Sequence, residues 1–271
     1  MGQQPYSVLL LEEPRQKIAR VRMGPPQVQK VQSQQEWIPA SPGRSVQVVS
    51  VHRMPPKAGL SSRLGQARLL HDLANIELQA LELGYRTYLE YPEAPQLFRQ
   101  QLWQIVEDEA RHLELCLNGL LNLQYEFGSF PVHLALWEAV SATDSLLQRL
   151  WIVHRYLEGS GLDAGETLLR RLKGVPLSIV HPIVAQIVQE EVAHVQFGNF
   201  WFGQLAQTAD DKDFATQLAF LKSRLPKRME VLSEGLRLEA GFTGDEILIL
   251  RQHREAQISE QLKAAQSKRV T

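Results

Sequence analysis

The sequence contains two Glu-x-x-His pairs, Glu109-Ala-Arg-His112 and Glu191-Val-Ala-His194. Each pair lies in the middle of a long segment whose apolar residues recur with the period of a helix. Side chains three residues apart share one helix face, so each pair offers a carboxylate and an imidazole to one point. A lone glutamate precedes each pair, because Glu77 lies 32 residues before Glu109 and Glu158 lies 33 residues before Glu191. This repeated pattern predicts that four helices contribute six ligands to a pair of metal ions.

The residues around these glutamates are typical of helix faces that point into a core. Residues one or two turns away are mostly apolar or small: Leu73, Ala74 and Leu81 for Glu77; Val106 and Leu113 for Glu109; Ile187, Val188 and Val195 for Glu191. A buried carboxylate without a partner costs several kcal/mol. Metal cations would compensate these charges, and carboxylate with imidazole ligands favours iron or manganese. We therefore expect Glu77, Glu109, His112, Glu158, Glu191 and His194 to be metal ligands.

The ligand on the third helix has three candidates. Glu158 fits both the 33-residue spacing and the core-facing stripe, but it precedes the glycines of Gly159-Ser-Gly161. Asp144 lies on the same stripe, nearer the expected helix centre, whereas Glu138 lies off it. We select Glu158 and keep Asp144 and Glu138 as alternatives. His154, four residues before Glu158, has two candidate roles, a residue that contacts the ligand and a core histidine, and we expect a core histidine.

The chain is expected to have three parts. Residues 1–60 are rich in Gln and Pro, and proline fixes φ and removes a donor, so we expect an extended arm with a short strand near Ser45–Val51. Residues 61–206 are expected to form a four-helix bundle, with a long crossover at about 121–136, and residues 207–271 to form helices that pack on it. The expected helices are 61–90, 95–123, 133–158, a short one ending near 173 after a break at Gly159–Asp163, 176–206, 211–239 and 243–265.

Composition restricts the class of protein. Hydrophobic residues make up 44% of the chain, the net charge is −1, and Cys116 is the single cysteine. One cysteine allows no internal disulfide, and no apolar run reaches the length of a membrane span. We therefore expect a cytoplasmic protein without a membrane partner. The charge gives no argument for nucleic acid, and a homodimer is compatible with the sequence.

At these residues the sequence resembles the ferritin-like superfamily, and more closely the uncharacterised family DUF455. The matching stretches lie between about residues 65 and 205: Ile76–Ala80, Asp108–His112, Phe130–His133, Leu136–Glu138, Leu157-Glu158, Gly161–Asp163 and Glu190–Val195. The resemblance implies an all-α, ferritin-like four-helix bundle that holds two iron ions, or one manganese and one iron. It implies no substrate, because a fold does not fix a function.

Three functions are compatible with this pattern. The first is a di-metal oxidoreductase, an oxidase or hydroxylase that uses O₂ and a small-molecule substrate, with an electron donor that the sequence does not identify. The second is a ferroxidase or peroxide-scavenging protein, which the extra residues at both ends and the single cysteine disfavour. The third is a non-catalytic helical scaffold stabilised by metal. We predict the first.

Overall fold

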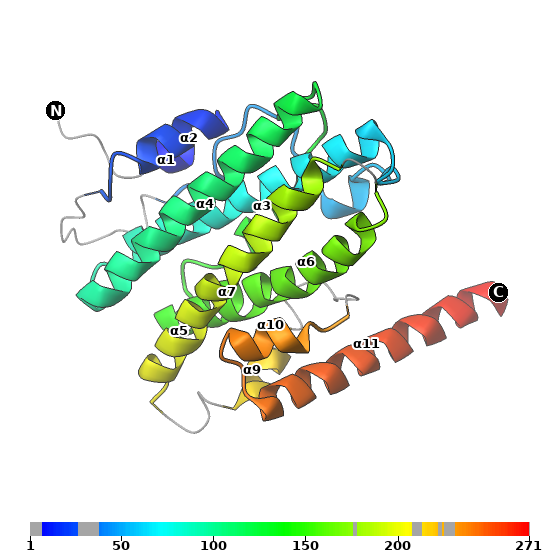
Figure 1. Cartoon of the computed structure of the whole chain (residues 1–271). Helices are drawn as coiled ribbons and strands as arrows, with labels where there is room; N and C mark the ends of the chain where they lie inside the picture. Colours follow the sequence, from blue (N-terminus) through cyan, green and yellow to red (C-terminus); the bar gives the residue numbers. More distant parts are fainter. Residues whose placement is uncertain are drawn as a thin grey trace. The chain divides into compact units, whose positions relative to one another are not determined.

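The computed structural model describes residues 7–26, 38–175, 178–207, 213–221, 224 and 231–270 (Figure 1). In these ranges every regular element is a helix, which confirms the predicted all-α class. The strand predicted near Ser45–Val51 is reduced to one parallel bridge between Val48 and Val132. Part of the predicted arm, residues 1–6 and 27–37, lies outside the described residues. None of the described helices has an apolar stretch long enough to cross a membrane.

The chain divides into two compact units. The first unit comprises Met1–Leu146 and Arg171–Ile187, and the second comprises Leu147–Arg170 and Val188–Thr271. The helices of the first unit are α1 (Ser7–Leu10), α2 (Pro14–Val21), α3 (Arg63–Glu90), α4 (Gln96–Asn122) and the first turns of α7 (Val180–Leu205), with short 3₁₀ helices at Val51–Arg53 and Trp137–Ala139. The second unit contains α5 (Leu146–Leu150), a π-helix (Trp151–Glu158), α6 (Gly159–Leu172), the rest of α7, α9 (Phe214–Leu221), α10 (Glu234–Glu239) and α11 (Gly244–Val270).

Helices α3 and α4 form the framework of the first unit and lie side by side (Figure 1). The hydroxyl of Ser62 accepts a hydrogen bond from the Gly65 amide at 3.0 Å, so this serine caps the N-terminus of α3. Gly84 allows close packing of the two helices, because a Cβ there would lie 2.7 Å from Val106 Cγ2. The ranges predicted for both helices, 61–90 and 95–123, are confirmed to within two residues.

A buried ion cluster joins the N-terminal segment to α3. Glu82 forms a salt bridge with Lys17 of α2 and accepts two hydrogen bonds, of 2.5 and 2.6 Å, from Arg44. Lys17 also donates to the carbonyl oxygen of Gly43 at 3.2 Å. Burial lowers the pKa of Lys17, while Glu82 opposes this shift. The predicted arm is therefore tied to α3 by charge, and it is not extended throughout, because α1 and α2 lie within it.

The predicted helix 133–158 is wrong in its first half. The carbonyl oxygen of His133 accepts hydrogen bonds from Asn75 and Gln79, each at 3.0 Å. The amides of Leu136 and Trp137 donate to Gln79 Oε1. Because α3 side chains bind these backbone groups, this stretch forms turns and a 3₁₀ helix, and the long helix starts only at α5.

The predicted break at Gly159–Asp163 is also wrong. The π-helix Trp151–Glu158 continues directly into α6, so Glu158 lies inside a continuous helical segment. Gly159 serves packing here, since a Cβ at this position would lie 2.9 Å from Arg237 Nη1. A helical glycine that makes room for a neighbour cannot be distinguished from a helix breaker by composition alone.

The C-terminal part of the second unit is attached to α6 through Asp163. This buried carboxylate accepts hydrogen bonds from Arg237 at 2.7 Å, from Arg254 at 2.5 Å and from the Ser233 amide at 2.8 Å. Gly241 has φ +90° and lies in the turn between α10 and α11, within the gap between the predicted helices 211–239 and 243–265. The predicted helix 211–239 is not continuous, because residues 231–233 are not helical; residues 211–212, 222–223 and 225–230 lie outside the described residues.

Replacing Glu82 by glutamine should destabilise the protein strongly. The substitution leaves Lys17 and Arg44 buried without a counter-ion, which costs about 3 to 5 kcal/mol. The control is Arg22→Gln, which removes a pair with Glu114 whose side chains are 54% and 32% exposed, and which should cost less than about 1 kcal/mol. Urea unfolding measures both variants. Equal costs would show that the buried cluster carries no special share of stability.

A second prediction concerns acid stability and His71 of α3. Its ring stacks on Phe127 and its Nε2 accepts a hydrogen bond from the Gly128 amide at 3.0 Å. Burial lowers the pKa of His71 to about 4. The folded state therefore binds this proton less readily than the unfolded state. The resulting stability is complete above pH 6.5 and is lost as the pH falls from about 6.5 to 4.

Unfolding in urea at pH 7 and pH 4 should reveal this effect in a comparison with His71→Phe. The wild type should lose about 3 kcal/mol more than the variant between the two pH values, because only the wild type takes up this proton. Parallel losses in the two proteins would contradict a buried, neutral His71.

Candidate metal centre

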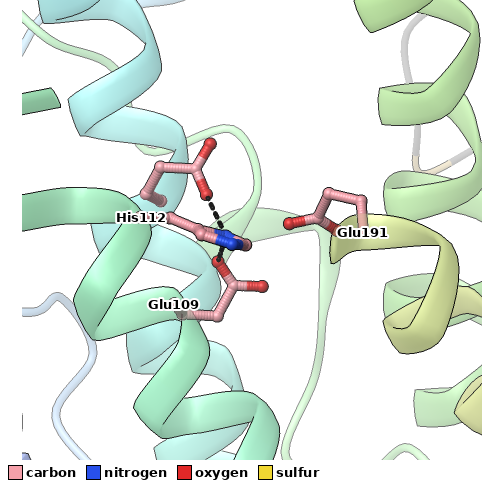
Figure 2. A group of neighbouring side chains, drawn as sticks. Glu109, His112 and Glu191 are labelled. Atoms are coloured by element: carbon pink, nitrogen blue, oxygen red, sulfur yellow. Dashed lines mark ion pairs between the residues drawn. The ribbon is translucent and has the colours of Figure 1, made fainter. Parts of the chain in front are cut away.

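The first unit brings three of the predicted ligands together. Glu77 comes from α3, and Glu109 and His112 come from one face of α4; their exposed fractions are 4%, 1% and 0%. Each offers one ligand atom, and these atoms all lie within 4.8 Å of one another. We call this set the first half-site. Figure 2 shows the carboxylate of Glu109 and the ring of His112 directed toward each other.

The distances in the first half-site suit atoms that share an ion. His112 Nδ1 lies 3.5 Å from Glu77 Oε2 and 3.7 Å from Glu109 Oε2, which is too long for good hydrogen bonds. Atoms bound to one metal with bonds of about 2.1 Å lie roughly 3 to 4 Å apart. The spacing of these three groups is therefore compatible with a cation between them.

The second unit brings the other three predicted ligands together, and we call Glu158, Glu191 and His194 the second half-site. His194 Nδ1 lies 3.4 Å from Glu191 Oε2, and ligand atoms of Glu158 and His194 lie within 4.8 Å. Glu191, also labelled in Figure 2, and His194 come from α7. Burial raises the pKa of Glu158; Glu191 adds to this, whereas His154 and His194 oppose it. A cation bound nearby would therefore stabilise the ionised form of the Glu158 carboxyl group.

The structure gives other roles to the two alternatives on the third helix. Asp144 Oδ2 accepts a hydrogen bond of 2.6 Å from the Ser141 amide, so Asp144 closes the turn that precedes α5. Glu138 is exposed in the 3₁₀ helix Trp137–Ala139. Neither belongs to the groups of His, Cys, Asp and Glu that could hold an ion in the described part of the chain. The choice of Glu158 nevertheless stays a prediction.

Two further titratable residues interact with the half-sites, one by a close contact and one electrostatically. His154 Nδ1 lies 2.8 Å from Glu158 Oε2, a hydrogen-bond distance. A core role was preferred for His154, and its four-residue spacing from Glu158 on a helix is the sequence signal for this contact. In the first unit, burial and the charge of Glu77 raise the pKa of the Cys116 thiol well above its usual value. A neutral thiol is a poor metal ligand, so carboxylates and imidazoles remain the donor set.

These observations define a class: an all-helical protein in which two half-sites, the first buried and the second partly buried, repeat a glutamate and a Glu-x-x-His pair. The chain belongs to the family described as "Protein of unknown function (DUF455)", which matches residues 10–248. A relative from Haemophilus influenzae, described as "Uncharacterized protein", is 29% identical over 202 residues, 71% of this chain and 70% of the relative. No solved structure matches the chain.

Replacing Glu158 and Asp144 by alanine, one at a time, should separate their roles. Glu158→Ala should remove one metal ion, because it deletes a ligand of the second half-site. Asp144→Ala should keep both ions but lose about 1 kcal/mol of stability, the usual cost of deleting a capping side chain. Elemental analysis and urea unfolding measure the two effects. Loss of metal in Asp144→Ala but not in Glu158→Ala would reverse the assignment.

Proposed function

We propose that this chain is a ferritin-like, di-metal carboxylate oxidoreductase. Glu77, Glu109, His112, Glu158, Glu191 and His194 hold two iron ions, or one manganese and one iron. The observation that carries the proposal is the first half-site, in which three almost fully buried groups offer ligand atoms within 4.8 Å of one another. Burial of two carboxylates this close together needs positive charge to offset their repulsion.

The donor set supports iron or manganese. Carboxylates and imidazoles suit these metals, whereas zinc and copper sites more often include thiolates. The charges of four carboxylates and two divalent ions cancel when both histidines are neutral. A neutral filled centre is far cheaper to bury than the apo centre, so metal binding should also stabilise the fold.

When bound, such a metal pair supplies the one-electron steps that reduction of O₂ or peroxide requires. The chain's own residues hold the ions and exclude water. Glu77 and Glu109 each provide two oxygens, and the apolar residues Leu81, Val106 and Leu113 close the surrounding core. The proposed co-reactants are O₂ or peroxide and a small-molecule substrate.

Metal loading tests the proposal directly. Protein loaded with Fe(II) without oxygen should hold about two ions per chain. Glu109→Gln should lose at least one ion, because it removes an ionised ligand from the first half-site. The matched control is Glu114→Gln on the same helix, since Glu114 pairs with Arg22 at the surface. Elemental analysis gives the ion count, and the rate of O₂ or peroxide consumption gives the reaction.

The outcomes separate the parts of the proposal. Well under one ion per loaded wild-type chain would overturn metal binding. If the chain holds two ions but consumes neither O₂ nor peroxide, the proposed metal site stands and the proposed oxidoreductase activity is overturned. Faster turnover of peroxide than of O₂ would point to a scavenging protein instead of an oxidase or hydroxylase.

A further inference from the structure

We propose that His154 is a positioning residue that holds the carboxylate of Glu158 in place for one metal ion. The inference rests on the proposed metal binding, and it assigns a role to a histidine outside the six ligands. All the contacts that support it lie within the second unit.

The geometry distinguishes His154 from the two proposed histidine ligands. His154 Nδ1 lies 2.8 Å from Glu158 Oε2, whereas His112 and His194 lie 3.4 to 3.7 Å from their glutamates. The shorter distance is that of a hydrogen bond, and the longer distances leave room for an ion. His154 therefore contacts a ligand carboxylate directly.

The ring of His154 is fixed by α7. Phe197 meets it edge-on, with ring centroids 5.1 Å apart. Gly198 lies against its backbone side, because a Cβ there would be 2.4 Å from His154 Cβ. Gly198 follows His194 by four residues, so both lie on one face of α7. The face of α7 that carries the proposed ligand His194 therefore also packs against His154, which contacts the proposed ligand Glu158.

The hydrogen bond also determines the tautomer of the His154 ring. An ionised Glu158 accepts hydrogen bonds, so the imidazole is protonated on Nδ1 and donates to Oε2. Nε2 is buried and has no hydrogen-bond partner within the described residues, and in this tautomer it carries no proton that needs one. His154 uses one lone pair of Oε2, so Oε1 and the second lone pair of Oε2 are the positions of Glu158 that we assign to a metal.

The local backbone gives independent support. The π-helix extends from Trp151 to Glu158 and therefore includes both residues of the pair. Single π turns within helices are rare and occur often at functional sites. Loss of a residue that hydrogen-bonds to a metal ligand typically lowers metal affinity by about 10- to 100-fold.

The test uses Mn(II) titration by calorimetry on the wild type, His154→Phe and His154→Asn. Phenylalanine keeps a ring but removes the donor, so one of the two ions should bind about 10- to 100-fold more weakly. Asparagine keeps an N–H donor near the position of Nδ1 but has no counterpart of Nε2. It should restore binding to near the wild-type level.

A glycine pair provides a test that leaves His154 unchanged. Gly198→Ala should displace the ring and weaken the same ion as His154→Phe. Gly203→Ala lies on the same helix with nothing within 4 Å of its added Cβ, so it should leave Mn(II) binding unchanged. Thermal unfolding without metal shows whether each variant folds; if His154→Phe does not, the asparagine and glycine variants decide.

Each outcome bears on a different claim. A wild type that binds no Mn(II) overturns both the proposed metal site and this inference. Two ions in the wild type with unchanged affinity in His154→Phe and Gly198→Ala overturn the inference alone. Equal loss in His154→Asn and His154→Phe would mean that Nε2, rather than the Nδ1 donor, is the atom that matters, and would also overturn it.

Discussion

Burial of ionised carboxylates is the constraint on which this structure depends. An isolated buried charge costs far more than one packing contact returns, so each must meet a compensating group. For Glu82 and Asp163 the chain supplies ammonium or guanidinium groups. Glu77 and Glu109 face the imidazole of His112 instead, a group that binds metals as well as protons. The charges of Glu82 and Asp163 are balanced by side chains of the protein itself, whereas Glu77, Glu109 and His112 together suit a bound cation.

The sequence was sufficient to predict the all-α class and the helix face that the glutamate and the histidine of each Glu-x-x-His pair share. Glutamate and histidine three residues apart share a helix face whatever the rest of the fold does, and the apolar residues one turn away indicate that this face is buried. Both properties are local, and the structure brings Glu109 and His112 together on α4 and Glu191 and His194 on α7. The ions and the reaction remain proposals.

What the sequence could not predict depends on contacts between distant residues. The turns at 133–137 exist because Asn75 and Gln79 bind that backbone, and no periodicity within the segment reveals this. Gly159 resembles a helix breaker until Arg237 is seen against it. The salt bridge between Lys17 and Glu82 spans 65 positions of the chain and carries no local signature.

The attachment of Asp163 has a consequence for synthesis of the protein on the ribosome. Its partners Arg237 and Arg254 follow it by 74 and 91 residues. At a translation rate of about 5 to 20 residues per second, α6 waits several seconds or longer for its counter-ions. Until then the carboxylate of Asp163 has no counter-ion, so burial of this face of α6 would cost several kcal/mol. The part of the chain that is made last therefore controls when this face of α6, which continues directly from Glu158, is buried.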